Sequence, residues 1–111
     1  MIEVGLRSAL HIREERVSDH PGASRLLYIS DIHLRRRRSG AIARQVLDAV
    51  GRSMPDLVLL GGDLVDSASE LPALSDLVRD MCDFAPVLAV GGNHDRRVGI
   101  DRVARAVADA T

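Results

Sequence analysis

Three short, largely apolar segments, spaced about thirty residues apart, constrain the fold of this 111-residue chain more than any other feature. They are Leu26–Ser30, Leu57–Leu60 and Val87–Val90. Short, nearly continuous apolar runs are typical of strands that are buried on both faces of a parallel sheet. Because a βαβ unit takes about thirty residues, the spacing predicts three parallel strands in succession along the chain.

An amphipathic segment follows each of these runs. Segments 39–52, 72–81 and 100–108 carry apolar residues at the three- and four-residue spacing of a helix face. Pro72 suits the first turn of its helix, where the missing N–H is not needed. The alternation of strands and helices predicts the α/β class, with a parallel βαβαβα arrangement.

The N-terminal segment is polar, and its pattern is less regular. We expect residues 1–24 to form an extension or a short strand around Leu10 and Ile12, with a turn at Asp19–Gly22. Residues 25–111 then form the domain that carries the parallel sheet.

Composition excludes several classes of protein. Aromatic residues make up only 2%, so the core must be aliphatic, and the single cysteine, Cys82, allows neither an internal disulfide nor a cysteine metal cluster. With 15 basic and 16 acidic residues the net charge is −1, which gives no electrostatic case for a nucleic-acid surface. The sequence shows no apolar run long enough to span a membrane and no secretory signal pattern, so we expect a cytoplasmic protein.

Residues of the types that bind metal ions follow each predicted strand. Asp31 and His33 follow the first strand, Asp63 follows the second after two glycines, and Asn93 follows the third after two more. The carboxyl ends of parallel strands meet at one edge of a sheet, which is where ligands bind in open α/β folds. A divalent cation would turn the repulsion between the converging carboxylates into attraction.

This ligand set predicts two adjacent metal sites. Asp31, His33 and Asp63 supply two oxygens and one nitrogen and leave room for water, as a catalytic metal site requires. Asn93 could hold a second ion that shares Asp63 as a bridge. Oxygen-rich ligation without thiolates suits Mn, Fe, Zn or Ni.

His94 lies between Asn93 and Asp95. A carboxylate beside a histidine can fix its tautomer and hold it cationic. At the rim of a metal site, such a histidine could contact a phosphate oxygen or protonate a leaving alkoxide.

The three motifs, in this order and spacing, resemble those of the calcineurin-like metallophosphoesterases, and most closely the small bacterial phosphodiesterase branch. They are Asp31-x-His33, Gly62-Asp63 and Gly92-Asn93-His94-Asp95. The resemblance implies a layered sheet fold and a two-metal hydrolase that cleaves phosphomonoesters or phosphodiesters with a metal-activated water.

The resemblance also implies a role for each matching residue. Asp31 and His33 would hold the first metal, and Asp63 would bridge both metals. In the last motif, Asn93 would hold the second metal, His94 would assist the leaving group, and Asp95 would orient that histidine.

Members of this family carry further metal-binding histidines downstream, which this chain of 111 residues lacks. We therefore expect it to match only the N-terminal half of the family fold, with an exposed sheet edge through which copies could associate. Two alternatives to an enzyme stay open. One is a catalytically inactive module that binds a metal or a partner, and the other is a gene fragment without a selected function.

Two further features allow two interpretations each. Asp66 is either a loop cap or a residue that supports the metal ligands. The four consecutive arginines Arg35–Arg38 form either a solvated loop or a clamp for phosphate groups.

Overall fold

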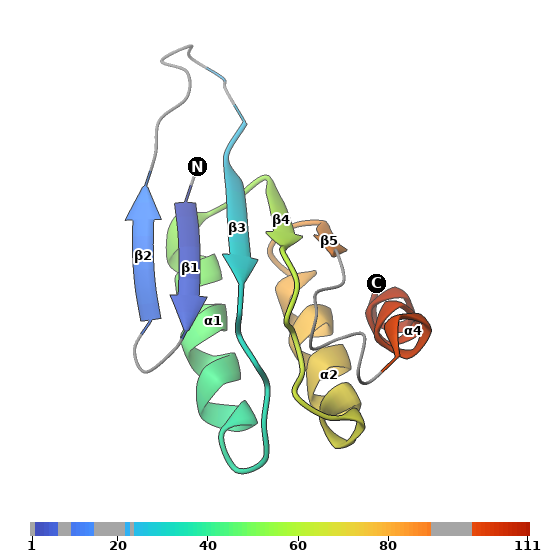
Figure 1. The fold of residues 1–111 in the computed structure, drawn as a ribbon. Helices are drawn as coiled ribbons and strands as arrows, with labels where there is room; N and C mark the ends of the chain where they lie inside the picture. The colour runs from blue at the N-terminus through green and yellow to red at the C-terminus, as the bar shows by residue number, and fades with distance from the viewer. Residues whose placement is uncertain (1, 7–9, 15–21, 23, 90–98) are drawn as a thin grey trace.

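The structure is a computed structural model that describes residues 2–6, 10–14, 22, 24–89 and 99–111. Its strands form one twisted sheet, and the helices α1 and α2 lie side by side behind that sheet in Figure 1. In chain order the elements are β1 (Ile2–Leu6), β2 (Leu10–Glu14), β3 (Leu26–Ser30), α1 (Ser39–Ser53), β4 (Leu57–Leu60), the short 3₁₀ helix η1 (Ala68–Glu70), α2 (Leu71–Met81), β5 (Val87–Ala89) and α4 (Ile100–Ala110).

The described strands lie in the order β2-β1-β3-β4-β5. β3, β4 and β5 pair in parallel and alternate with helices along the chain, so the predicted α/β class is confirmed. Strand β1 pairs in parallel with β3, and β2 pairs antiparallel with β1. We expected residues 1–24 to form an extension or a short strand, whereas the structure shows two paired strands there that extend the sheet beyond β3.

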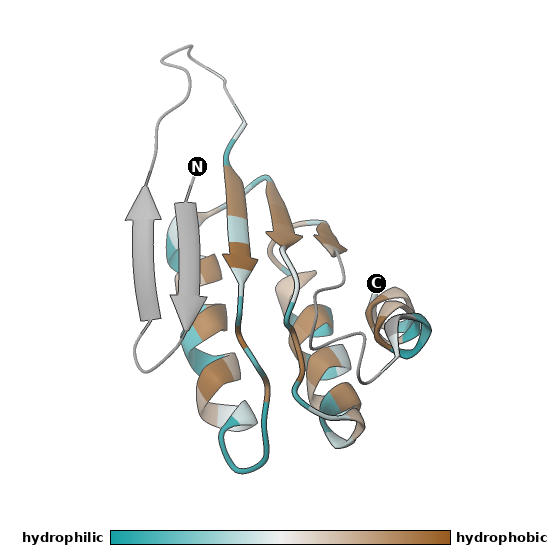
Figure 2. Ribbon diagram, viewed as in Figure 1, coloured by the Kyte–Doolittle hydropathy of each residue, from teal (hydrophilic) through white to brown (hydrophobic). Residues whose placement is uncertain are grey.

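The core lies between the sheet and the two helices behind it. Alternate residues of β3 and β4 face this layer and are fully buried, as are Val46 of α1 and Leu74 of α2. Figure 2 shows apolar residues along these strands and on the helices behind them. The fully buried side chains include Leu27, Ile29, Val58, Leu60, Val46, Val50, Leu74, Val78 and Met81.

The opposite face of the sheet has no such layer among the described residues. Tyr28 and Leu59 on this face are only partly buried, and Leu88 is 57% exposed. The prediction that the strands are buried on both faces is therefore wrong for the described part of the chain. The alternating burial of β3 and β4 has a simple cause, because α1 and α2 cover only one of the two faces.

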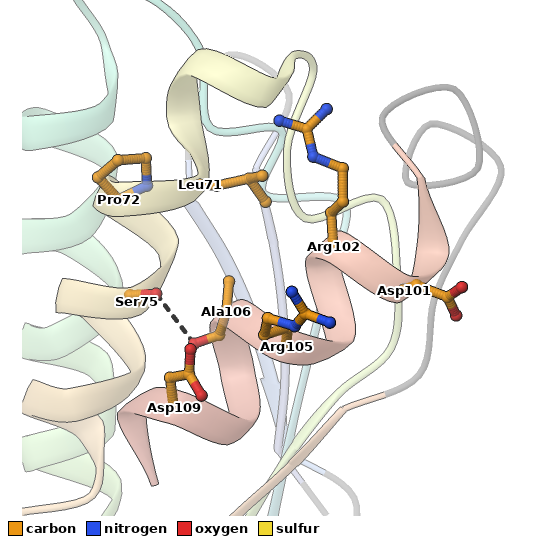
Figure 3. A pocket seen from close by; sticks show the side chains of 8 residues that line it. All are labelled: Leu71, Pro72, Ser75, Asp101, Arg102, Arg105, Ala106 and Asp109. Atoms are coloured by element: carbon orange, nitrogen blue, oxygen red, sulfur yellow. Dashed lines mark hydrogen bonds between the residues drawn. The ribbon is translucent and has the colours of Figure 1, made fainter.

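Helix α4 packs against α2 through a narrow apolar stripe. Val103 and Val107 of α4 are buried, and the Ser75 hydroxyl of α2 donates a hydrogen bond to the Ala106 carbonyl oxygen at 2.9 Å. Figure 3 shows the groove beside this contact, where Arg102 and Arg105 are interspersed with two aspartates. The described helices are all too short or too polar to cross a membrane.

Candidate metal centre

The two chain segments that leave β3 and β4 run alongside each other beyond the ends of the strands. The amides of Asp31 and His33 donate hydrogen bonds to the carbonyl oxygens of Gly62 (3.1 Å) and Asp63 (3.0 Å). One step further, the Leu34 amide donates to the Leu64 carbonyl oxygen at 2.9 Å. The backbone of each segment therefore holds the other, although neither is a regular strand.

Buried aliphatic side chains anchor these two segments in the core. Ile32, Leu34, Leu64 and Val65 are all fully buried, and Leu34 and Val65 form an isolated parallel bridge. These apolar residues alternate along the 31–34 segment with the polar residues Asp31 and His33, which are exposed and partly buried. The alternating sequence therefore buries the apolar side chains and leaves the polar side chains at the edge of the sheet.

All three predicted ligands that the structure describes have a left-handed backbone. The φ angles are 57° at Asp31, 46° at His33 and 50° at Asp63. Side-chain-bearing residues rarely adopt this conformation, although Asp and His tolerate it better than most. Such strained residues cluster at functional sites, where the surrounding structure holds them in place.

The paired glycines before Asp63 are each required by local geometry. Gly62 has a φ of +116°, which a residue with a Cβ adopts only with strain. At Gly61, a Cβ would overlap the ring and hydroxyl of Tyr28, which lies directly over this glycine. The turn from β4 toward the predicted ligands therefore depends on the glycine at position 62, whereas Gly61 leaves room for the Tyr28 ring.

The three side chains meet in one cluster. Asp31, His33 and Asp63 each offer a ligand atom, and these atoms all lie within 4.8 Å of one another. The Nε2 atom of His33 is 3.8 Å from Oδ1 of Asp31. Since nitrogen and oxygen ligands bind at about 2.0–2.2 Å from an ion such as zinc, two ligands of one ion lie at most about 4.4 Å apart. The cluster fits one divalent cation with shifts of a few tenths of an ångström.

Asp66 orients the imidazole of His33. Its Oδ1 atom is 2.8 Å from Nδ1 of His33, and its amide donates a hydrogen bond to the Leu34 carbonyl oxygen at 3.0 Å. When Nδ1 carries the proton and donates a hydrogen bond to Asp66, Nε2 has a free lone pair on the side of the ring that faces Asp31. A carboxylate in this position is a common partner of metal-binding histidines.

The sequence left two interpretations open for Asp66, and this contact favours support of the ligands. The signal was its position three residues after Asp63 in the same loop. The remaining predicted residues, Asn93, His94 and Asp95, lie outside the described residues.

The donor set is compatible with hard or borderline divalent ions. Two carboxylates and one imidazole, without a thiolate, match the preferences of Mn, Fe, Zn and Ni. Asp31 is 53% exposed and the His33 side chain 22% exposed, so the cluster is open to solvent and to a ligand.

Comparison with known proteins adds independent information. The family model of the calcineurin-like phosphoesterases matches residues 24–107, which includes every element from β3 to most of α4. Phosphodiesterase YaeI of Escherichia coli (strain K12) is 33% identical over 86 residues, which are 76% of this chain and 32% of that protein. The chain thus spans about a third of the length of this curated relative. No solved structure matches it.

The family match extends over strands β3, β4 and β5, both helices behind them and the cluster at the carboxyl edge of β3 and β4. This chain belongs to the calcineurin-like phosphoesterases.

Proposed function

We propose that this chain is a metal-dependent phosphoesterase that hydrolyses phosphomonoesters or phosphodiesters with a metal-activated water. The observation that carries this proposal is the convergence of Asp31, His33 and Asp63, from two separate segments, to within 4.8 Å. Family membership supports a phosphoester as the substrate, and the relative YaeI is named as a phosphodiesterase.

In this proposal, Asp31 and Nε2 of His33 would hold one divalent ion, Asn93 would hold a second, and Asp63 would be a ligand of both. When bound, such ions would supply a nucleophilic water and offset the negative charge of phosphoryl transfer. His94 assists departure of the leaving group, and Asp95 orients His94.

Several of the described residues hold the predicted ligands in position for this chemistry. The Asp66 carboxylate lies 2.8 Å from Nδ1 of His33, which favours the tautomer that leaves Nε2 available as a ligand. The hydrogen bonds between the 31–34 and 62–66 segments fix the spacing of the carboxylates before any ion binds. Preorganised groups lose little free energy to rearrangement when a charged ligand arrives.

The test is hydrolysis of bis(p-nitrophenyl) phosphate and p-nitrophenyl phosphate by the full chain with Mn²⁺. We expect turnover that Asp63→Asn abolishes. Asp80→Asn, which makes the same change at an exposed position on α2, should leave turnover unchanged. Equal rates for wild type and Asp63→Asn would contradict the proposal.

A second candidate function is a metal-binding module without hydrolytic activity. The observation in its favour is that the ligand groups found among the described residues form a single triad. One bound ion per chain and no hydrolysis of either ester would favour the module, whereas two ions with turnover would favour the enzyme.

A further inference from the structure

A turn of four arginines, Arg35–Arg38, joins the candidate metal centre to helix α1. Arg36, Arg37 and Arg38 are exposed, and Arg35 is partly buried. The net charge of the whole chain is −1, so this turn is a local concentration of positive charge on a nearly neutral protein. The proposed hydrolysis does not use it.

The backbone of this arginine turn is well ordered by hydrogen bonds. The Arg35 carbonyl oxygen accepts hydrogen bonds from the amides of Arg38 and Ser39, each at 3.0 Å. Arg37 has a left-handed φ of 69°. Glycine or asparagine would adopt this conformation more easily, so the sequence keeps a guanidinium here at some cost in backbone strain.

Within the described part of the chain, no acidic side chain neutralises the positive charge of the turn through a salt bridge. Among the described residues, the salt bridges within 4.0 Å involve none of the four guanidinium groups. Glu70 lies at the same end of α1, but its carboxylate accepts hydrogen bonds from the hydroxyls of Ser39 (2.6 Å) and Ser69 (3.4 Å). Like charges so close together repel one another, and a bound anion would relieve that repulsion.

The turn lies next to the candidate metal centre. Nη1 of Arg35 donates a hydrogen bond to the carbonyl oxygen of His33 at 3.3 Å. Arg36 is three residues after His33, so their Cα atoms are at most about 11 Å apart. An anion bound by the turn is therefore within reach of a small molecule that also occupies the metal centre.

Guanidinium groups bind phosphoryl oxygens through paired hydrogen bonds, which makes arginine the preferred residue for such anions. We propose that the arginine turn binds a second phosphoryl group of the substrate, so that the preferred substrates are phosphoesters that carry two phosphoryl groups. This inference rests on the proposed function, because it places the first phosphoryl group at the metal centre.

Binding to metal-free protein tests the turn without any need for hydrolysis. Pyrophosphate and orthophosphate are titrated into the full chain after passage over a chelating resin, and the side-chain Nε–H signals of the arginines are followed by NMR. We expect pyrophosphate to shift the signals of Arg36–Arg38 and to bind about tenfold more tightly than orthophosphate, because it can engage more guanidinium groups at once.

The matched variants separate the turn from the general effect of charge. Arg36→Gln/Arg38→Gln should weaken pyrophosphate binding at least about tenfold. Arg44→Gln/Arg52→Gln removes the same charge from exposed positions on α1, and should change binding less than about twofold because screened charges at a distance contribute little. Equal weakening in both double variants, or no difference between the two anions, would overturn the inference.

A second arm distinguishes a soluble substrate from a lipid surface. Sedimentation with phosphatidylglycerol vesicles is compared with sedimentation with phosphatidylcholine vesicles. Binding to the anionic vesicles that depends on Arg36 and Arg38, with no response to pyrophosphate, would overturn the inference in favour of membrane docking.

The final arm uses hydrolysis. With Mn²⁺, a nucleoside p-nitrophenyl phosphodiester that carries an additional 3′-phosphate should have a lower KM than the same diester without it. The Arg36→Gln/Arg38→Gln variant should remove this difference. If neither ester is hydrolysed, the proposed function fails, but the metal-free titration still decides whether the turn binds paired phosphoryl groups.

Discussion

The helix-covered face of the sheet and its carboxyl edge are built on opposite principles. On the covered face, Leu27, Ile29, Val58 and Leu60 alternate in regular strands and are fully buried. At the edge, a few residues further along the same two segments, the predicted ligands have a left-handed backbone. Two of them, Asp31 and Asp63, place carboxylates close together. The first region stabilises the fold, and the second is held in an unfavourable arrangement by the first.

This comparison predicts that the largest effects on stability come from the covered face. Leu77 of α2 is 1% exposed, and Leu77→Ala should lower the free energy of unfolding by about 2–5 kcal/mol, through lost burial and a new cavity. Leu88→Ala makes the same change at a residue that is 57% exposed and should cost less than about 1 kcal/mol. Urea denaturation of both variants measures the difference, and similar losses would show that Leu88 is covered in solution.

At the edge, the prediction for stability has the opposite sign. Asp63→Asn removes one of two neighbouring carboxylates, so the metal-free variant should unfold at the same or a higher urea concentration than wild type. The same substitution should weaken Mn²⁺ binding by more than about a hundredfold, because an amide replaces a charged ligand. It should also erase the rise in melting temperature that Mn²⁺ gives to wild type. A variant that is less stable without metal, and that still responds to Mn²⁺, would show that charge repulsion does not destabilise this edge and that Asp63 is not needed to bind the ion.

A smaller effect is expected at Asp66, which contacts His33 and is not itself in the ligand triad. Asp66→Ala should lower the affinity for Mn²⁺ by about 10–100-fold, as found for partners of metal-binding histidines. Asp66→Asn retains an oxygen that can accept a hydrogen bond from the Nδ1–H group of His33, so it should recover part of the loss. Calorimetric titration of both variants checks this order, and equal affinities in Asp66→Ala and wild type would rule out the supporting role.

The smallest effect on stability is expected where the backbone is strained outside the candidate metal centre. Met54 follows α1 with a φ of 45° and is 75% exposed. Met54→Gly should raise the free energy of unfolding by about 0.5–1 kcal/mol, because glycine adopts this conformation without steric cost. Mn²⁺ affinity should not change. Asp31→Gly relieves the same kind of strain but removes a predicted ligand, so it should lose Mn²⁺ affinity, which distinguishes strain that serves the site from strain that does not.

The sequence predicted the three parallel strands and their helices because each element carries its own pattern. The run from Leu57 to Leu60 and the helical spacing in segment 39–52 need no information from the rest of the chain. Strand β1 was missed, although Ile2, Val4 and Leu6 alternate with polar or small residues. Five residues of alternation are a weak signal when no turn of known type follows.

The site was predictable in its composition but not in its geometry. Spacing brought Asp31 and Asp63 to one edge, because parallel strands end there. Their left-handed backbone and the contact between Asp66 and His33 depend on how the 31–34 and 62–66 segments pair, which no local pattern encodes. The same holds for Gly61, whose lack of a side chain matters because Tyr28 lies over it.

We propose that the segments after β3 and β4 converge on one cation through Asp31, Asp63 and Nε2 of His33. Nitrogen-15 NMR of the His33 imidazole during titration with Zn²⁺, a diamagnetic ion, tests this claim most directly. We expect the Nε2 signal to shift on binding while Nδ1 keeps its proton, and we expect Asp63→Asn to weaken the response greatly. An unchanged Nε2 signal at saturating Zn²⁺, or coordination through Nδ1 with loss of the Asp66 contact, would contradict it.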